Sequence, residues 1–445
     1  MPQVFPFRAV QYTLGSELSA VVAPPYDVLD VKAKEALLAR SPSNIVGVDL
    51  PHVPPKELGP AASYDAAGAR YRQMLASKTL ARREKPALFA YRQTFTFEGA
   101  THQRCGMFAT VNAVAFGTRS GGGVLPHEET FSGPKEDRLA LMNATQAQLS
   151  PIFGLHADDS GAATKLVRSV MDSRKPDITA TMDYDKVLHE VWVIEDEATI
   201  AAYRKALAGE DVFIADGHHR YNTQLNYIKQ QESYGPVPSD DPIRKCMMVL
   251  IGMSDPGLVI GPTHRVLGGM KDYSIEAFKG AATGLLNFEP VAGDLDKLGT
   301  AVKAATKENS VGLYDFASKQ AFMINPTKAD PLAARFASKP REWRTLDVAL
   351  IQHLIVEEIC QPKLNGGQPV KWAFPHSVAE VAEIGRGAET GAGGGKGFVA
   401  QMAVIVRPTP LEAVRAVSKA NELMPQKSTF FYPKLATGLF VNPLE

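Results

Sequence analysis

The chain has 445 residues, and its 48 Lys and Arg residues balance 48 Asp and Glu residues, which gives a formal net charge of zero. This length is too great for one ordinary hydrophobic core and predicts two or three domains. The zero net charge argues against the broad positive surface of a nucleic-acid-binding protein, although it allows a local basic patch. A hydrophobic content of 45% is typical of soluble globular proteins.

The cysteines and the apolar segments indicate a soluble protein of the cytoplasm. Cys105, Cys246 and Cys360 lie far apart in the chain, a spacing that favours neither a disulfide framework nor a zinc site. The N-terminal residues lack the basic and apolar regions of a signal peptide. Apolar runs such as 246–253 are too short to cross a bilayer, so we expect no membrane partner.

Strand-like and helix-like segments alternate along the chain without a repeat. Residues 20–30 read as a short strand stopped by two prolines, and 87–114 predict two strands joined by a turn at Glu98-Gly99. A second hairpin is expected around residues 317–319. Further strands are expected at 186–196, at 211–216 and twice within 246–267, and helices at 31–42, 63–80, 139–149, 197–207, 345–360 and 410–423.

These elements predict an α/β to α+β protein with mixed sheets. We expect three regions. Residues 1–165 carry a Pro-His-Glu loop, residues 166–268 carry an Asp-Gly-His-His-Arg turn, and residues 269–445 form a C-terminal α+β region with a Pro-Gln-Lys-Ser-Thr segment. The glycine-rich residues 389–397 resemble a P-loop, but Lys396 is followed by glycine rather than Ser or Thr, so a mobile loop is the better interpretation.

The most unusual stretch is DVFIADGHHRYNTQL, residues 211–225. An apolar strand, a tight turn at glycine and then a helix aim backbone N–H groups at an anion. Gly217 can take positive φ and lets a ligand approach the backbone. His218 and His219 then stand where the helix dipole favours negative charge, and Arg220 adds a planar fork suited to phosphate oxygens. We therefore predict a phosphate-binding turn.

Two alternatives compete with that interpretation. In the plainer one, Asp216 caps the helix and the histidines pack locally, as polar residues at helix starts commonly do. In the other, Asp216 and the histidines hold a metal ion. Adjacent histidines on an extended backbone point to opposite sides, however, and the sequence has no H-E-x-x-H spacing. The phosphate interpretation is favoured over both.

A second candidate group lies in GGGVLPHEETFSGPKEDR, residues 121–138. His127 and Glu128 follow a glycine run and a proline, and Arg138 lies near the start of the next helix. A carboxylate on such a loop is placed to act as a base toward a substrate hydroxyl. The alternative is an ordinary solvated loop.

A third candidate group lies in MPQKSTFFYPKLATGLF, residues 424–440. Lys427, Ser428 and Thr429 supply a cation and two hydroxyls in a row, and Lys434 follows a second proline. Such groups suit a carboxylate or a phosphate. The alternative is a C-terminal strand with a solvated turn. His264, at a strand end, is a weaker candidate to face a site.

Several of these stretches together carry a family resemblance. VVAPPYDVLD, NIVGVDLP, LPHEETFSGPKEDRLALMNATQAQLSPIFGLH and FIADGHHRYNTQLNY resemble the bacterial and archaeal domain-of-unknown-function family 1015 over nearly the full length. ADGHHRY is also similar to the Asp-Gly-His-His-Arg motif of free-serine kinases with the ParB/sulfiredoxin-like fold. In those kinases a preceding Pro-His-Glu segment supplies the catalytic glutamate, and a Pro-Lys-Thr-Thr stretch lies near the C-terminus.

The chain also departs from that pattern. The interval between Glu128 and Asp216 is longer than in the compact kinases, and Gln426 separates Pro425 from the lysine that follows it. In sulfiredoxin a cysteine stands where this chain has His218, so sulfinic acid reduction is not expected. The resemblance implies a ParB/sulfiredoxin-like nucleotide-binding core with large additional α+β regions.

The resemblance further implies a kinase that moves a phosphate from ATP or ADP, with Mg²⁺, onto the hydroxyl of a small molecule, with free L-serine as the best single acceptor. Nucleic acid is not an expected partner. A nucleotide-binding switch of ParB-like type and a phosphate-ester hydrolase are the alternatives. The implied roles are catalysis for Glu128, Asp216 and His219, nucleotide binding for Gly217, His218, His219, Arg220 and Arg138, acceptor binding for His127, Lys427, Ser428 and Thr429, and Mg²⁺ binding for Asp216.

Overall fold

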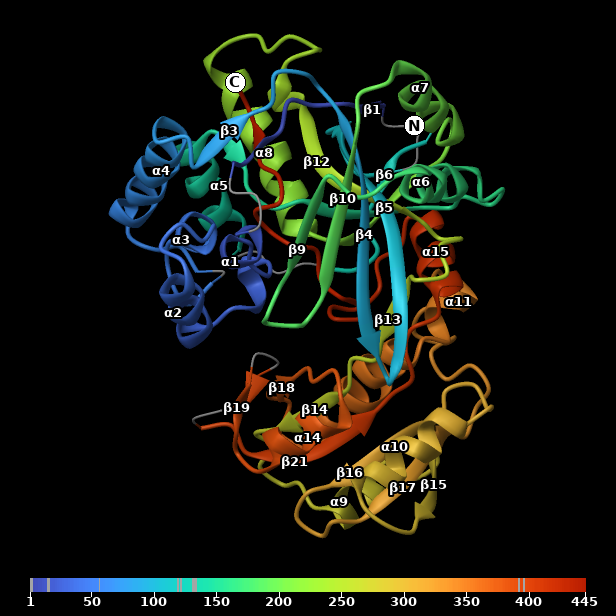
Figure 1. The fold of residues 1–445 in the computed structure, drawn as a ribbon. Coiled ribbons are helices and arrows are strands. Elements are labelled where there is room, and N and C mark those ends of the chain that lie inside the picture. The colour runs from blue at the N-terminus through green and yellow to red at the C-terminus, as the bar shows by residue number, and fades with distance from the viewer. Residues whose placement is uncertain are drawn as a thin grey trace. The chain divides into compact units, whose positions relative to one another are not determined.

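The structure is a computed structural model that describes residues 3–13, 17–55, 57–117, 120, 122–129, 134–390, 393–394 and 397–445. The chain forms two compact units (Figure 1). The first unit comprises Met1–Pro126, Thr130–Val259 and Pro433–Glu445, and the second comprises His127–Glu129 and Ile260–Tyr432. The three-region division predicted from the sequence is finer and stays a prediction.

A nine-stranded mixed sheet forms the centre of the first unit. Its strand order is β6-β11-β8-β12-β5-β4-β10-β9, and β1 pairs separately with β5. β8 and β12 are parallel, whereas β11 and β8 are antiparallel. The strands are β1 (Val4–Phe5), β4 (Leu88–Phe97), β5 (Ala100–Asn112), β6 (Val124–Leu125), β8 (Ile152–His156), β9 (Ile178–Thr181), β10 (Leu188–Ile194), β11 (Val212–Asp216) and β12 (Lys245–Gly252). Two small sheets pair β2 (Val10–Tyr12) with β3 (Leu80–Arg82), and β7 (Ala147–Gln148) with β23 (Asn442–Pro443).

Helices of the first unit pack against this sheet and against one another. The helix α5 contacts both α4 and α8, and α6 contacts α7 (Figure 1). Buried apolar residues from the sheet and from α6, α7 and α8 share one core. The helices are α1 (Leu18–Val21), η1 (Tyr26–Val28), α2 (Val31–Arg40), α3 (Val46–Asp49), α4 (Ala61–Ala76), α5 (Pro134–Thr145), α6 (Ala162–Ser173), α7 (Glu197–Ala206), α8 (His218–Tyr234) and η2 (Pro242–Arg244).

A six-stranded sheet of order β15-β17-β16-β21-β14-β18 organises the second unit. Its members are β14 (Arg265–Gly268), β15 (Leu286–Val291), β16 (Val311–Asp315), β17 (Ala321–Pro326), β18 (Lys371–Ala373) and β21 (Ala400–Ile405). The unit also contains β22 (Phe430–Tyr432), and the chain passes from the first unit to the second within β13 (Val259–Gly261).

Helices cover both faces of this second sheet. Along β21, Met402 and Val404 join a core with α9 and η3, whereas Ala403 and Ile405 join a second core with α10 and α14. This alternation follows from the two-residue period of a strand. The helices are α9 (Ile275–Ala281), α10 (Leu295–Ala304), α11 (Arg341–Arg344), α12 (Asp347–Leu350), the π-helix η3 (Ile351–Cys360), α13 (Gln361–Leu364), α14 (Val378–Gly385) and α15 (Leu411–Lys419).

The predicted mixed α/β fold class is confirmed, and so are most of the predicted elements. The hairpin at Glu98-Gly99 joins β4 to β5, with positive φ at both turn residues. The strand predicted at residues 20–30 is wrong, because this segment contains the end of α1, a single bridge from Ala23 to Thr437, and η1. Pro24 and Pro25, which follow, have no N–H to donate to a ladder, so pairing does not continue.

In the glycine-rich segment, β19 (Glu389–Thr390) pairs with β20 (Gly393–Gly394). Residues 391–392 and 395–396, which are part of the predicted mobile loop, lie outside the described residues.

Within the described part of the chain, none of the helices combines the length and apolar character needed to cross a membrane.

Candidate functional site

The predicted phosphate-binding turn lies between β11 and α8 in the first unit. Asp216 ends β11 and pairs with Phe153 of β8 after a break in the strand register. Gly217 follows as the N-cap of α8. Its φ of 94° is a left-handed backbone conformation that glycine adopts readily. The first intrahelical hydrogen bond runs from Tyr221 N to Gly217 O at 3.0 Å. The amides between these two residues therefore lie where helix N-termini bind anions.

The carboxylate of Asp216 lies between two cations. Arg220 Nη2 donates to Asp216 Oδ2 at 2.6 Å, and Lys434 Nζ donates to Asp216 Oδ1 at 2.7 Å. Arg220 also donates through Nη1 to the carbonyl oxygen of Pro151. Burial would raise the pKa of Asp216, but Lys434 and Arg220 hold it well below its usual range. The N-cap residue of α8 is Gly217, and the charged carboxylate of Asp216, one residue earlier, holds two cations at the start of the helix.

The two histidines begin α8, as the sequence predicts. His218 is buried and His219 is half-buried. Their backbone carbonyls accept from side chains one turn later: Asn222 donates to His218 O at 3.0 Å, and Thr223 donates to His219 O at 2.8 Å. These contacts stabilise the first turn of the helix. The roles of the histidines in catalysis and nucleotide binding stay predictions.

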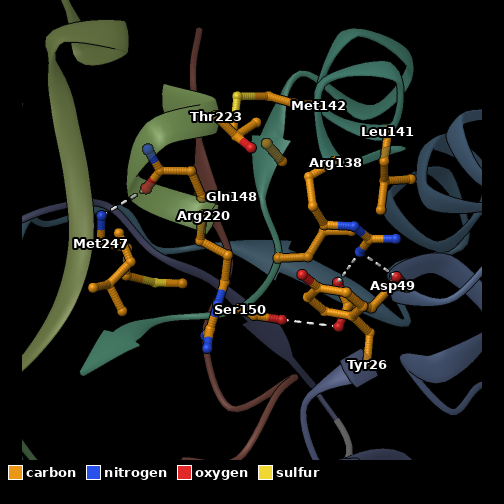
Figure 2. A pocket seen from close by; sticks show the side chains of 13 residues that line it. Tyr26, Asp49, Arg138, Leu141, Met142, Gln148, Ser150, Arg220, Thr223 and Met247 are labelled. Atoms are coloured by element: carbon orange, nitrogen blue, oxygen red, sulfur yellow. Dashed lines mark hydrogen bonds and ion pairs between the residues drawn. The ribbon is translucent and has the colours of Figure 1, made fainter. Parts of the chain in front are cut away.

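Arg138 lines a pocket of the first unit that also includes Arg220 (Figure 2). Its Nη1 donates to the carbonyl oxygen of Asp49 at 2.7 Å, and its Nε donates to Asp137 Oδ2 at 2.6 Å. The guanidinium carbon lies 3.8 Å from the ring centroid of Tyr26. The structure thus brings together two residues predicted to bind nucleotide, Arg138 and Arg220, in the wall of one pocket.

The same pocket is small, and its polar end is tightly bonded. Its volume of about 40 Å³ can hold ordered water but is far below the about 300–1,000 Å³ typical of small-molecule sites. Ser150 donates to Asp49 Oδ2 at 2.8 Å, and Tyr64 of α4 donates to Asp137 Oδ1 at 2.7 Å. Arg138 and its carboxylates therefore join α3, α4 and α5. Nucleotide binding by Arg138 stays a prediction.

His127 and Glu128 of the Pro-His-Glu loop lie beside the Lys-Ser-Thr segment in the second unit. Glu128 forms a parallel bridge with Met424. Met424 N donates to His127 O at 2.9 Å, and Glu129 N donates to Met424 O at 3.1 Å. Two motifs that lie about 300 residues apart in sequence are therefore held in register by backbone hydrogen bonds.

Side chains complete this pairing. Ser428 N donates to Glu128 Oε2 at 3.1 Å. His127, which is fully buried, has its Nε2 2.7 Å from Thr429 Oγ1, and the same Nε2 lies 3.7 Å from Glu128 Oε2. The Glu128 side chain stays 19% exposed. An acceptor molecule could therefore reach this carboxylate, which a catalytic base requires.

Arg265 fixes the backbone that carries Lys427. Arg265 is buried, and it donates to the carbonyl oxygens of Thr263 and Lys427. Burial lowers the pKa of Arg265 to about 10, although the nearby charge of Glu128 opposes this shift. Lys427 itself is exposed and has φ 60°, a left-handed conformation that is uncommon for lysine. Its side chain is thus free to reach solvent from a fixed position.

His264, the weaker candidate, precedes β14 in the second unit. It is buried, and its Nδ1 accepts a hydrogen bond from Val406 N at 3.2 Å. Burial lowers the pKa of His264 to about 3, so the imidazole is neutral at pH 7. The ring supports the backbone that follows β21, and a role for His264 at a site stays a prediction.

The residues with predicted roles divide between the two units. Asp216, Gly217, His218, His219, Arg220 and Arg138 belong to the first unit, and His127, Glu128, Lys427, Ser428 and Thr429 belong to the second. Among the residues that the structure describes, no group of three or more His, Cys, Asp or Glu is placed to hold a metal ion. Nucleotide-bound Mg²⁺ commonly needs only one or two carboxylates beside the phosphates, so Mg²⁺ binding by Asp216 stays a prediction.

The sequence interpretation missed the partners of two residues. Lys434 pairs with Asp216 across 218 positions, and Arg265 holds the carbonyl of Lys427 across 162 positions. No local pattern marks either contact. In the sequence, Lys434 is recognisable only as a basic residue after a proline, and Arg265 only as a basic residue after a histidine at a strand end.

The family of the chain follows from its sequence. Residues 4–349 match the model of the family described as protein of unknown function DUF1015. The chain therefore belongs to this family. A comparison with curated protein sequences finds no match.

Solved structures with some similarity include free serine kinases. A variant free serine kinase in complex with ADP is 11% identical, with 71% of this chain and 89% of that chain covered and a TM-score of 0.32. A free serine kinase in complex with AMP is 11% identical, with 73% and 95% covered and a TM-score of 0.32. SbnI from Staphylococcus aureus, with a C-terminal truncation, is 11% identical, with 72% and 84% covered and a TM-score of 0.31.

Proposed function

We propose that this protein is a small-molecule phosphotransferase that moves a phosphate from ATP or ADP onto a hydroxyl, with free L-serine as the first acceptor to test. The observation that supports it best is the arrangement at Asp216, where two cations and the first amides of α8 meet at one glycine turn. Phosphoryl transfer needs little covalent chemistry from a protein and depends on positioning and charge neutralisation.

Each unit would have its own part in the reaction. In the first unit, the amides after Gly217 and the cation Arg220 would bind the phosphates of the nucleotide. Asp216 would keep Arg220 in place, and a Mg²⁺ ion on Asp216 would have to compete with Arg220 and Lys434 for the carboxylate. His218 and His219 would add donors beside the phosphates.

In the second unit, Glu128 would orient the acceptor hydroxyl and take its proton as the new phosphate ester forms. Lys427 is exposed on a fixed backbone, so it would bind the carboxylate of the acceptor. Ser428 contributes its backbone N–H to Glu128, and Thr429 holds the ring of His127. These two residues would therefore keep the base in position.

The test is phosphorus NMR of the protein with Mg²⁺ and either ATP or ADP, in the presence and absence of L-serine. We expect a new phosphomonoester signal only in samples with serine. Glu128→Gln should lower turnover about 10²- to 10⁴-fold, as is usual for a lost general base, while nucleotide affinity by calorimetry stays within about threefold.

The matched control is Glu129→Gln. Glu129 is the next residue, is exposed, and uses only its backbone N–H in the contact with Met424, so this variant should keep full turnover. Normal turnover in the Glu128 variant would remove Glu128 from the mechanism. Phosphate release without any acceptor would instead favour a hydrolase, and binding without turnover would favour a nucleotide-dependent switch.

A further inference from the structure

The C-terminal segment of the first unit brings a lysine to the phosphate-binding turn. Lys434 Nζ lies 2.7 Å from Asp216 Oδ1, and the Lys434 side chain is 22% exposed. The lysine therefore has access to solvent at the same carboxylate that holds Arg220. Lys434 lies 218 positions from Asp216, and the residues around it in the sequence do not predict this contact.

Two buried polar side chains of the large sheet fix the backbone on which this lysine stands. Gln93 Nε2 donates to Lys434 O at 3.0 Å, and Arg104 Nη2 donates to Pro433 O and to Gln93 Oε1. Gln93 and Arg104 are each only 1% exposed. The backbone at Lys434 is thus held by side chains of the sheet, and the Lys434 side chain is held by Asp216.

Arg104 is a buried cation that donates to the backbone of this segment. Burial lowers the pKa of Arg104 to about 10, because the interior disfavours its charge. The guanidinium carbon lies 4.6 Å from the ring centroid of Phe153, the residue that pairs with Asp216 in the strand register. Arg104, Phe153 and Asp216 therefore connect the segment to the turn through adjoining groups.

Asp216 is outnumbered by the cations that it contacts directly. Asp216 is one anion, whereas Arg220 and Lys434 are two cations. The N-terminus of α8 adds the positive end of a 17-residue helix dipole. Asp27 and Asp49 supply further negative charge near Arg220, so an incoming phosphate would find its positive partners at Lys434 and at the first amides of α8.

We propose that Lys434 is a phosphate-binding residue of this turn and that Asp216 positions both Lys434 and Arg220 for the incoming anion. This inference rests on the proposed phosphate-binding function of the turn, and it adds a residue from the far end of the chain. Lys434 Nζ needs only to rotate from the carboxylate toward a phosphate oxygen, because its backbone is already fixed. Its charge assists binding of a phosphate group and does not recognise the nucleoside.

The test is calorimetry with three probes: ADP, inorganic pyrophosphate and adenosine. Lys434→Gln should weaken the binding of ADP and pyrophosphate about 10- to 100-fold, as expected for a lost charge-assisted hydrogen bond. The binding of adenosine, which has no phosphate, should not change. Lys434→Arg keeps the charge and should stay within about threefold of the native affinity.

Lys186→Gln is the matched control, because Lys186 is a 77% exposed lysine of the same unit, 3.5 Å from Asp183. It should bind all three probes normally. The outcomes separate the two proposals. If Lys434→Gln binds ADP and pyrophosphate as tightly as the native protein, the inference about Lys434 is wrong and the proposed function survives. If the native protein binds pyrophosphate through Lys434 but transfers no phosphate, the inference holds and the kinase proposal fails. If the native protein binds neither ADP nor pyrophosphate, both fail.

Discussion

Replacing Gly217 by alanine should disturb the proposed phosphate-binding turn, and the structure gives the size of the expected effect. Gly217 has φ 94°, and a Cβ atom built there would lie 3.1 Å from both Cζ and Nε of Arg220. That guanidinium is held by Asp216 and by the carbonyl of Pro151. The methyl group must therefore either strain the backbone further or move Arg220 away from its partners.

The expected cost has two parts. A left-handed backbone costs a residue other than glycine about 1–2 kcal/mol. Moving a guanidinium from a charge-assisted hydrogen bond adds a fraction of the roughly 1.5–3 kcal/mol that such a bond contributes, about 1 kcal/mol here. We expect Gly217→Ala to lower the free energy of unfolding by about 2–3 kcal/mol and to weaken ADP binding about fivefold or more.

Gly209→Ala provides the matched control. Gly209 is also in the first unit and has φ 85°, but a Cβ atom there would meet nothing within 4 Å. This variant should lose only the backbone part, about 1–2 kcal/mol, and should bind ADP normally. The difference between the two variants therefore isolates the contact between Gly217 and Arg220.

The assay is urea unfolding followed by tryptophan fluorescence, with ADP affinity measured by calorimetry. In a background with Trp343→Phe and Trp372→Phe, Trp192 is the remaining tryptophan and reports on the first unit. Equal losses of stability for both variants, together with unchanged ADP affinity, would refute the reasoning that Gly217 is needed to place Arg220.

Two further predictions concern half-buried polar groups. Thr429→Val removes the hydroxyl that lies 2.7 Å from His127 Nε2. It should destabilise the second unit by about 1–2 kcal/mol, whereas Thr429→Ser, which keeps the hydroxyl, should not. Equal effects of the two variants in urea unfolding would contradict the contribution of this hydrogen bond to stability. Burial raises the pKa of Asp185 from 3.8 to about 6. Because the unfolded chain loses this proton first, the folded protein should lose stability as pH rises from about 4 to about 6. Asp185→Asn should therefore stabilise the protein by about 1–3 kcal/mol at pH 7.5 but not at pH 3.5, and an equal gain at both pH values would exclude the charge as its cause.

Much of the local structure could be read from the sequence because it depends on neighbouring residues. The apolar run of β11, the glycine after it and the polar helix α8 all lie within 23 residues, and each has a strong preference for the structure observed. The hairpin at Glu98-Gly99 is equally local. The strand predicted at residues 20–30 is wrong because an apolar run next to two prolines does not reveal whether a partner strand exists.

The candidate site shows where such local reasoning ends. The sequence identified Asp216 and the residues after it as a group, and it identified the Pro-His-Glu and Lys-Ser-Thr segments as candidates. It did not reveal that Glu128 accepts the N–H of Ser428, or that Asp216 is held by Lys434 from 218 positions away. The first kind of feature follows from backbone preferences and side-chain chemistry within a few residues. The second kind depends on which distant segments pack together, and only the burial and hydrogen bonding of the whole tertiary structure decide that.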